Sequence, residues 1–176
     1  MKSPILLAAA LLLSPLAALA HGPTPQKIDE AIELPATPDE LWKTIGDFAA
    51  PERWNPALRS TRTDKGSTAG STRQITLANG LRLEEQLDEI DAAGRTMSYR
   101  SGATVDPKAL PASSWSARLR VTAQGSGSRL EWRVRAYRAD TGNEPAPGMD
   151  DAAVVAGFQA LIKPALDHLR ASGGRS

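Results

Sequence analysis

The chain has 176 residues and a formal net charge of +1, because 21 basic side chains nearly balance 20 acidic ones. This length is typical of one compact domain, and the even charge balance argues against a nucleic-acid partner. There is no cysteine, which excludes disulfides and thiolate metal sites, and only His21 and His168 could supply an imidazole. We therefore expect no metal centre and no cofactor.

The first twenty residues have the pattern of a secretory signal peptide. Lys2 precedes an apolar run from Ile5 to Leu19, and Ala18-Leu19-Ala20 is a small-x-small cleavage site. The run is short for a membrane span, so we favour cleavage after Ala20 over the alternative of an uncleaved anchor. We predict a periplasmic or secreted protein without a stable membrane span. It is divided into signal peptide 1–20, flexible leader 21–26, one domain 27–172 and disordered tail 173–176.

Alternating residues over 27–34 predict a first strand, and a helix start signal follows it. The sequence Thr37-Pro38-Asp39-Glu40 combines a good N-cap, a proline suited to the first turn and a glutamate that can close a capping box. We expect this helix to run to about Ala50. The prolines of 51–56 then predict a second, shorter helix that ends quickly.

Six further strand-like segments follow at short spacing, separated by turn residues. They cover residues 59–65, 71–78, 81–90, 96–101, 115–121 and 129–137. In the last two segments one face is apolar and the other is rich in arginine: Arg118, Arg120, Arg133 and Arg135. We interpret the arginine face as the solvated side of an antiparallel sheet. A docking patch for anionic lipid or an acidic protein is the alternative.

A long C-terminal helix is predicted after a loop rich in glycine and proline. Asp150 and Asp151 suit its N-terminus, and apolar residues recur at helical spacing at Val154, Phe158, Leu161, Ile162, Ala165 and Leu169. Pro164 is expected to kink the helix or to remove one hydrogen bond. A seven-stranded sheet with one wet face needs its other face covered, and this helix is long enough to cover it. The predicted fold class is α+β, a helix-grip fold in which the curved antiparallel sheet wraps around the helix and leaves a cavity.

The hairpin around Asn79-Gly80 brings two charged residues to the apolar face of the sheet. A three-residue loop, 78–80, pairs Leu77 with Leu81 and aligns the apolar faces, whereas a two-residue loop would scramble them. In that register Arg73 lies directly opposite Glu85. Buried charges need partners. The pair is therefore a cross-strand ion pair that fixes the register, a polar anchor for a mostly apolar ligand, or both.

Several short motifs occur in order along the domain. They are Pro38-x-x-Leu41-Trp42 with Asp47-Phe48, Arg53-Trp54-Asn55-Pro56, Gly70-x-x-Arg73, Gly80 with Glu85-Gln86-Leu87, Tyr99, Leu110-Pro111, Gly127 with Trp132, and Gly157-Phe158-x-x-Leu161. On these motifs, the chain from about Ile28 to Leu169 resembles the START/Bet v 1-like (SRPBCC) superfamily, in its polyketide cyclase/dehydrase branch. The resemblance implies the helix-grip fold.

The central hairpin is also similar to that of the plant abscisic acid receptors, which share its Gly-x-Thr-Arg and Glu-x-Leu sequences. This similarity implies that Glu85 lines the ligand cavity. The chain departs from the receptors in two places: its loop 78–80 is shorter than their gating loop, and 57–59 has no counterpart of their carboxylate-binding lysine. Hormone recognition is therefore not implied.

The predicted ligand-binding residues are Arg73, Glu85, Met97, Tyr99, Trp115, Trp132, Phe158 and Leu161. Ordinary core packing is the alternative for each apolar residue taken alone. No Ser-His-Asp or Cys-His arrangement can be assembled, so no catalytic residue is assigned. We favour a binding protein for a small apolar or amphipathic ligand, without turnover.

Two other functions stay open. One is a cyclase, dehydratase or isomerase that uses Glu85 as base and Arg73 or Tyr99 to stabilise developing charge. The other is an accessory protein that docks on another exported protein through the arginine face. The resemblance to exported members of the superfamily implies this second role, for example in a periplasmic alcohol oxidation system.

Overall fold

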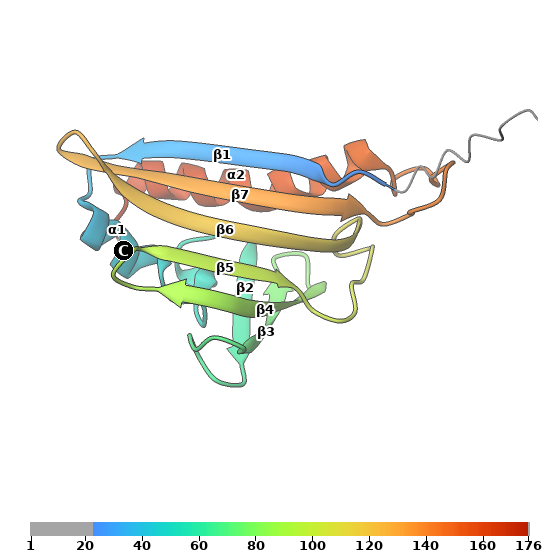
Figure 1. Cartoon of the computed structure of the whole chain (residues 1–176), viewed down its shortest axis with the longest axis horizontal. Helices are drawn as coiled ribbons and strands as arrows, with labels where there is room; N and C mark the ends of the chain where they lie inside the picture. The colour runs from blue at the N-terminus through green and yellow to red at the C-terminus, as the bar shows by residue number, and fades with distance from the viewer. Residues whose placement is uncertain (1–22, 176) are drawn as a thin grey trace, which may run out of the picture.

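The computed structural model describes residues 23–175, so the predicted signal peptide lies outside the described residues. In chain order the elements are β1 (Gln26–Leu34), α1 (Pro38–Ile45), the 3₁₀ turn η1 (Pro51–Arg53), β2 (Leu58–Thr63), β3 (Thr72–Leu77), β4 (Arg82–Asp91), β5 (Thr96–Ser101), β6 (Ala112–Gln124), β7 (Gly127–Arg138) and α2 (Asp151–Ser172). The strands form one antiparallel sheet in the order β1-β7-β6-β5-β4-β3-β2, so β1 pairs with β7 (Figure 1).

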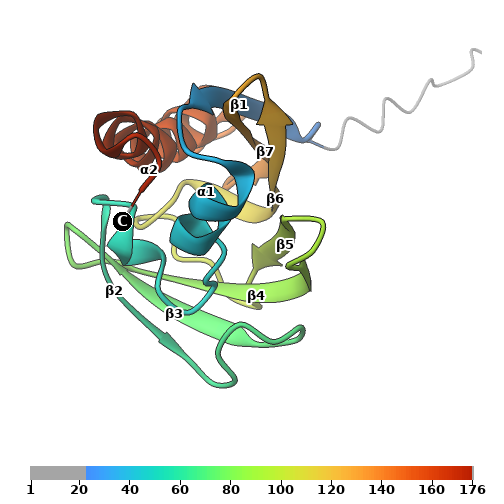
Figure 2. The same cartoon turned by 90° about the vertical axis from the view of Figure 1, so that its left-hand side faces the viewer.

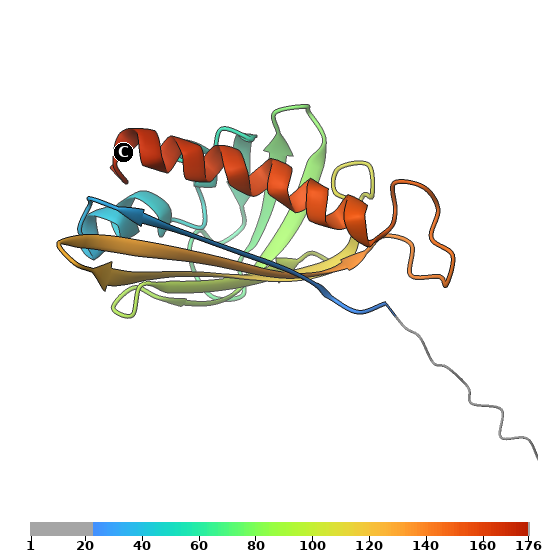
Figure 3. The ribbon, with the colours of Figure 1, turned by 90° about the horizontal axis from the view of Figure 1, so that it is seen from above.

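The sheet curves around the helices, and Figure 2 shows α1 and α2 on its concave side. The helix α2 packs along β1 and β7 (Figure 3). Apolar side chains that alternate along the strands point to this side and form one core with α1 and α2. The predicted helix-grip fold, with seven antiparallel strands and a long C-terminal helix, is confirmed.

The β3–β4 hairpin has the predicted three-residue loop. The Leu77 amide donates to the Leu81 carbonyl at 2.8 Å, and the Gly80 amide donates to the Leu77 carbonyl at 2.9 Å. Gly80 has φ of +88°, a left-handed conformation that glycine adopts without a Cβ penalty. The loop fixes the register in which Arg73 pairs with Glu85 across the strands.

The first helix ends at Ile45, and the expectation that it runs to about Ala50 was wrong. Its predicted capping box at Thr37 is present. At the other end the Gly46 amide bonds to the Trp42 carbonyl, and a Cβ at Gly46 would lie 2.7 Å from the Trp42 ring. The Asp47 carboxylate then accepts the Ala49 amide at 2.9 Å, which turns the chain out of the helix. The expected second helix is the single 3₁₀ turn η1.

The helix α2 has 22 residues and continues through Pro164 without interruption. Within residues 23–175 no helix combines the length and apolar character needed to cross a membrane. Beyond α2 lies the stretch expected to be a disordered tail. There Gly173 has φ of +64° and its carbonyl accepts the Ala36 amide at 3.3 Å. The Gly174 carbonyl accepts the Thr44 hydroxyl at 3.2 Å, so these two glycines close the end of the core.

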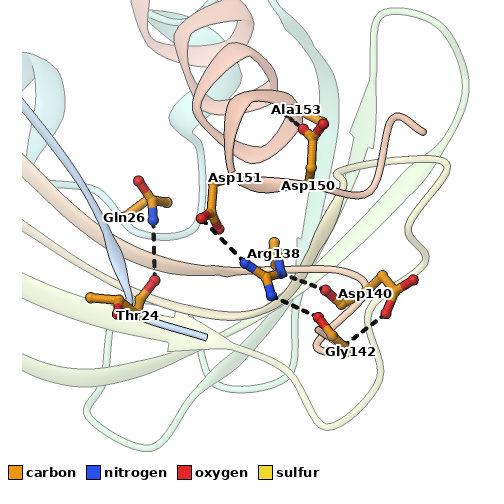
Figure 4. A network of polar contacts seen from close by, with 8 residues as sticks. All are labelled: Thr24, Gln26, Arg138, Asp140, Gly142, Asp150, Asp151 and Ala153. Atoms are coloured by element: carbon orange, nitrogen blue, oxygen red, sulfur yellow. Dashed lines mark hydrogen bonds and ion pairs between the residues drawn. The ribbon is translucent and has the colours of Figure 1, made fainter. Parts of the chain in front are cut away.

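The loop between β7 and α2 is held by Arg138 (Figure 4). Its guanidinium donates to the Asp140 carbonyl at 2.7 Å, to the Gly142 carbonyl at 2.7 Å and to the Asp151 carboxylate at 3.2 Å. The Asp140 side chain accepts the Ala146 and Gly142 amides, and these bonds lower the pKa of Asp140 below its usual value. Asp150 caps α2 through the Ala153 amide, and the Arg138–Asp151 contact ties the start of the helix to β7.

Candidate functional site

A small cavity lies between the concave face of the sheet and α2, with a volume of about 40 Å³. A buried water needs about 10–15 Å³, so the cavity has room for about three water-sized groups. Its wall is mostly apolar and is formed by Ile45, Asp47, Pro51, Trp54, Asn55, Leu58, Arg73, Ile75, Leu83, Glu85, Met97, Tyr99, Ala117, Leu119, Trp132, Val134, Phe158, Leu161 and Ile162.

The charged pair in this wall comes from β3 and β4. Arg73 donates to one Glu85 oxygen, Oε2, from Nη2 at 2.6 Å and from Nε at 2.8 Å. The two side chains are only 6% and 8% exposed. The cross-strand ion pair expected from the hairpin register is therefore formed, and it is buried.

Three other elements complete the contacts of the pair. Arg73 Nη1 donates to the Phe48 carbonyl at 2.9 Å, and the guanidinium lies 4.1 Å from the centre of the Phe48 ring. It also lies 4.8 Å from the centre of the Tyr99 ring. The other Glu85 oxygen, Oε1, accepts the Trp115 indole N–H at 3.1 Å. Both carboxylate oxygens are therefore occupied, and both charges are compensated by hydrogen bonds and ring faces.

Tyr99 on β5 carries the phenol nearest to this pair. Burial raises the pKa of Tyr99 well above its usual value, and the negative charge of Glu85 raises it further. The positive charge of Arg73 lowers this pKa to a lesser extent, and so does the nearby Trp132 indole, although the Trp132 N–H lacks the distance and angle of a hydrogen bond. Tyr99 therefore stays a neutral phenol at all physiological pH values.

The eight residues predicted from the sequence lie together around the cavity. Seven are in its wall: Arg73, Glu85, Met97, Tyr99, Trp132, Phe158 and Leu161. Trp115 lies outside this wall. Its indole donates to Glu85, and its ring packs edge-on against the Phe158 ring, with 5.7 Å between the centroids. Whether these residues bind a ligand stays a prediction.

Sequence reasoning missed the contribution of the segment after α1. Trp54 lies in the cavity wall, and its ring is 5.5 Å from that of Trp132. Asn55 donates to the Leu161 carbonyl at 3.2 Å and accepts the Ala57 amide at 3.0 Å, which ties this segment to α2. The Arg53-Trp54-Asn55-Pro56 motif was the one sequence signal for this segment. Periodic patterns assign side chains to faces of strands and helices, and they do not predict where a residue between such elements points.

The arginine face lies on the convex, solvated side of the sheet. Arg135 donates from Nη2 to Asp29 at 3.0 Å, and this hydrogen bond lowers the pKa of Asp29 below its usual value. Arg133 pairs with Glu131 at 3.2 Å. Within residues 23–175, Arg118 and Arg120 have no carboxylate within 4.0 Å, and Arg118 lies opposite Arg133 on the next strand. Only part of the arginine face is therefore neutralised within the chain.

The chain is similar to known proteins in sequence pattern and in fold. A sequence model of the family described as polyketide cyclase / dehydrase and lipid transport matches residues 25–173. The fold is similar to that of XoxI from Bacillus cereus, with a TM-score of 0.69 at 18% identity, over 83% of this chain and 94% of that one.

Two further solved structures share this fold. Ginseng major latex-like protein 151 from Panax ginseng has a TM-score of 0.62 at 11% identity, over 85% of this chain and 98% of that one. Ara h 8.0201 has a TM-score of 0.62 at 20% identity, over 85% and 97%. No curated protein sequence matches the chain. At such low identities these structures establish the fold and not the ligand.

Proposed function

Because the chain belongs to the polyketide cyclase / dehydrase and lipid transport family, we propose that it binds a small apolar or amphipathic molecule, without turnover, in the cavity between the sheet and α2. The observation that carries this proposal is the cavity itself, which has mostly apolar walls and a buried ion pair, Arg73–Glu85, that is fixed by hydrogen bonds. Small-molecule sites generally combine these two features.

The contacts of Glu85 favour binding over catalysis. A general base needs an oxygen that can approach a substrate proton. In this site Arg73 donates twice to one Glu85 oxygen and Trp115 donates once to the other, so three of about four lone-pair positions of the carboxylate are already used. Tyr99 is a neutral phenol, so it would act only as a hydrogen-bond donor or acceptor. The pair is better suited to hold the site in shape than to move protons.

Export is part of the proposal and rests on the sequence of residues 1–20. Cleavage after Ala20 would leave His21 as the first residue. The intact mass of the protein recovered from the periplasm or the culture medium tests this directly. A mass that begins at His21 supports export, whereas a mass that retains Met1 in the cytoplasm contradicts it.

Native mass spectrometry of protein isolated gently from its own host tests ligand binding. We expect a discrete added mass on the wild-type chain. Ala117 lies in the cavity wall, and Ala117→Leu would add three carbon atoms to a space that holds about three water-sized groups. That variant should lose the added mass. Ala31→Leu on the exposed side of β1 is the matched control and should keep it.

Two results would contradict the binding proposal. The first is a wild-type chain that carries no added mass and binds none from a broad set of apolar compounds. The second is an added mass that Ala117→Leu retains unchanged, because the ligand would then lie outside the cavity. Circular dichroism and urea unfolding of both variants establish that the chains compared are folded.

A second candidate function is docking on another exported protein through the arginine face. The specific observation is that, among the described residues, Arg118 and Arg120 have no carboxylate within 4.0 Å. Arg118 lies opposite Arg133 on the next strand, whereas Arg120 lies opposite Glu131. Like charges on opposite residues of neighbouring strands are destabilising, and an acidic partner would relieve this repulsion. Charge reversal at Arg118 and Arg120 should abolish capture of an acidic partner. Unchanged capture by that variant would exclude this surface.

A further inference from the structure

Two indole N–H groups in the cavity wall have no hydrogen-bond partner. Among the described residues, Trp54 Nε1 and Trp132 Nε1 are fully buried and donate to no acceptor. The two residues are 4% and 7% exposed, and both belong to the wall of the cavity. Buried donors are nearly always paired in proteins, so an unpaired donor in a cavity wall calls for an acceptor that occupies the cavity, either a water or a ligand.

The described residues of the cavity wall offer such a molecule no unpaired positive charge. Its one arginine already donates three hydrogen bonds, two to Glu85 and one to Phe48, so the positive charge is compensated. Asp47 and Glu85 are both in the wall and are both acidic. An anionic ligand would therefore be buried beside carboxylates without a free cation, which is unfavourable. A neutral oxygen acceptor avoids that cost.

This inference rests on the proposed function and specifies the ligand's chemistry. We propose that the cavity takes a neutral, carbonyl-bearing apolar molecule, whose carbonyl oxygen accepts from the indole N–H of Trp54 or Trp132. A carbonyl oxygen has two lone pairs and can accept two donors. Trp115 does not take part, because its indole already donates to Glu85 at 3.1 Å.

A ketone and an alkene of the same shape test the inference. Acetone and isobutene have four non-hydrogen atoms each, which suits the small cavity, and they differ mainly in whether an oxygen or a CH₂ group is double-bonded to the central carbon. The chain has four tryptophans, so an amide correlation spectrum of ¹⁵N-labelled mature protein shows one indole N–H signal for each. Trp→Phe variants assign the signals. Titration then gives an affinity and a shift for each indole.

We expect the ketone to bind about 10-fold more tightly than the alkene, a factor that corresponds to about 1.4 kcal/mol. The ketone should move the Trp54 or Trp132 N–H signal to lower field and leave that of Trp115 nearly in place. Trp54→Phe or Trp132→Phe should remove the ketone's advantage, so that the ratio of the two affinities falls to about one in that variant. The matched control is Trp42→Phe, since Trp42 is not in the cavity wall, and it should keep the advantage.

Two other outcomes separate this inference from the proposed function. If ketone and alkene bind equally and no indole signal shifts, the acceptor inference is wrong and the apolar cavity is still a binding site; resident water then satisfies the indoles. If neither compound binds, and no larger ketone or hydrocarbon binds either, both the binding proposal and this inference are wrong. Using two separate Trp→Phe variants keeps the test valid if one of them fails to fold.

Discussion

Removing either partner of the Arg73–Glu85 pair should destabilise the protein strongly, and the loss of stability should depend on which partner is removed. Removing one partner of a buried ion pair generally costs about 3–5 kcal/mol. Glu85→Gln leaves a guanidinium that still donates to the Phe48 carbonyl and lies over two aromatic rings, so we expect a loss near the lower limit, about 3 kcal/mol. Arg73→Met leaves a buried carboxylate whose other donor is the Trp115 indole, so we expect about 4–5 kcal/mol.

A double-mutant cycle measures the interaction itself. The double variant removes both charges, so its loss should be smaller than the sum of the single losses by about 2–3 kcal/mol. Urea unfolding followed by tryptophan fluorescence gives the free energy of unfolding of each chain. The dependence on urea should be the same for all four chains, because the surface exposed on unfolding is nearly unchanged.

An exposed pair on α2 provides the control. Asp167 and Arg170 are 2.7 Å apart, but their side chains are 71% and 54% exposed. The same cycle with Asp167→Asn and Arg170→Met should give a coupling below about 0.5 kcal/mol. If the Arg73–Glu85 cycle is equally small, the pair is not a buried ion pair in solution. If Glu85→Gln costs more than Arg73→Met, the Phe48 and Tyr99 contacts do not stabilise the free cation.

Three further predictions concern single side chains. Gly157→Ala should destabilise the fold by about 1–2 kcal/mol although alanine is the better helix former, because its Cβ would lie 2.9 Å from Pro111 Cδ and 3.0 Å from Leu110 Cδ1; a rise in the urea midpoint would contradict this. Above pH 10, the free energy of unfolding should fall less steeply with pH in Tyr99→Phe than in the wild-type chain. The folded pKa of Tyr99 is raised above the unfolded value of 10.0, so its stabilisation is fully present below pH 10 and is lost as the pH rises; an unchanged alkaline slope would show that Tyr99 ionises normally. Thr37→Ala should cost about 1 kcal/mol through loss of the capping box at α1, and a thermal scan that shows no decrease would argue against the cap.

The sheet was predictable because alternation and turn chemistry constrain each other there. The loop 78–80 fixes which residues of β3 face those of β4, and a slip of one residue would turn every side chain to the other face. The pairing of Arg73 with Glu85 could therefore be predicted from the sequence alone. The apolar faces of β6 and β7 followed in the same way, since Trp115 and Trp132 alternate with exposed residues.

The segment between α1 and β2 was not predictable, because tertiary contacts decide its path. Gly46 packs against the Trp42 ring, and Asp47 bonds to the Ala49 amide and the Ser67 hydroxyl. Gly46 is a common residue at helix ends, but Phe48 continues the helical spacing of apolar residues, so the sequence alone left the end of this helix open. Trp54 reaches the cavity through a tertiary contact as well: Asn55 is bonded to α2, which lies more than a hundred positions away in the chain. No local pattern encodes a contact of that separation.

The size of the cavity also limits how a ligand can enter. At about 40 Å³ it is far smaller than the pockets of about 300–1,000 Å³ that hold drug-sized molecules. Leu161 belongs both to its wall and to an outer groove of about 390 Å³ between α2 and the β3–β4 loop. We expect a larger ligand to displace Leu161 and to occupy part of that groove. If such an open form made up about 1% of the protein, the observed affinity would be about 100-fold weaker than the intrinsic one. For the ligand that we propose, size as well as polarity should therefore set the affinity.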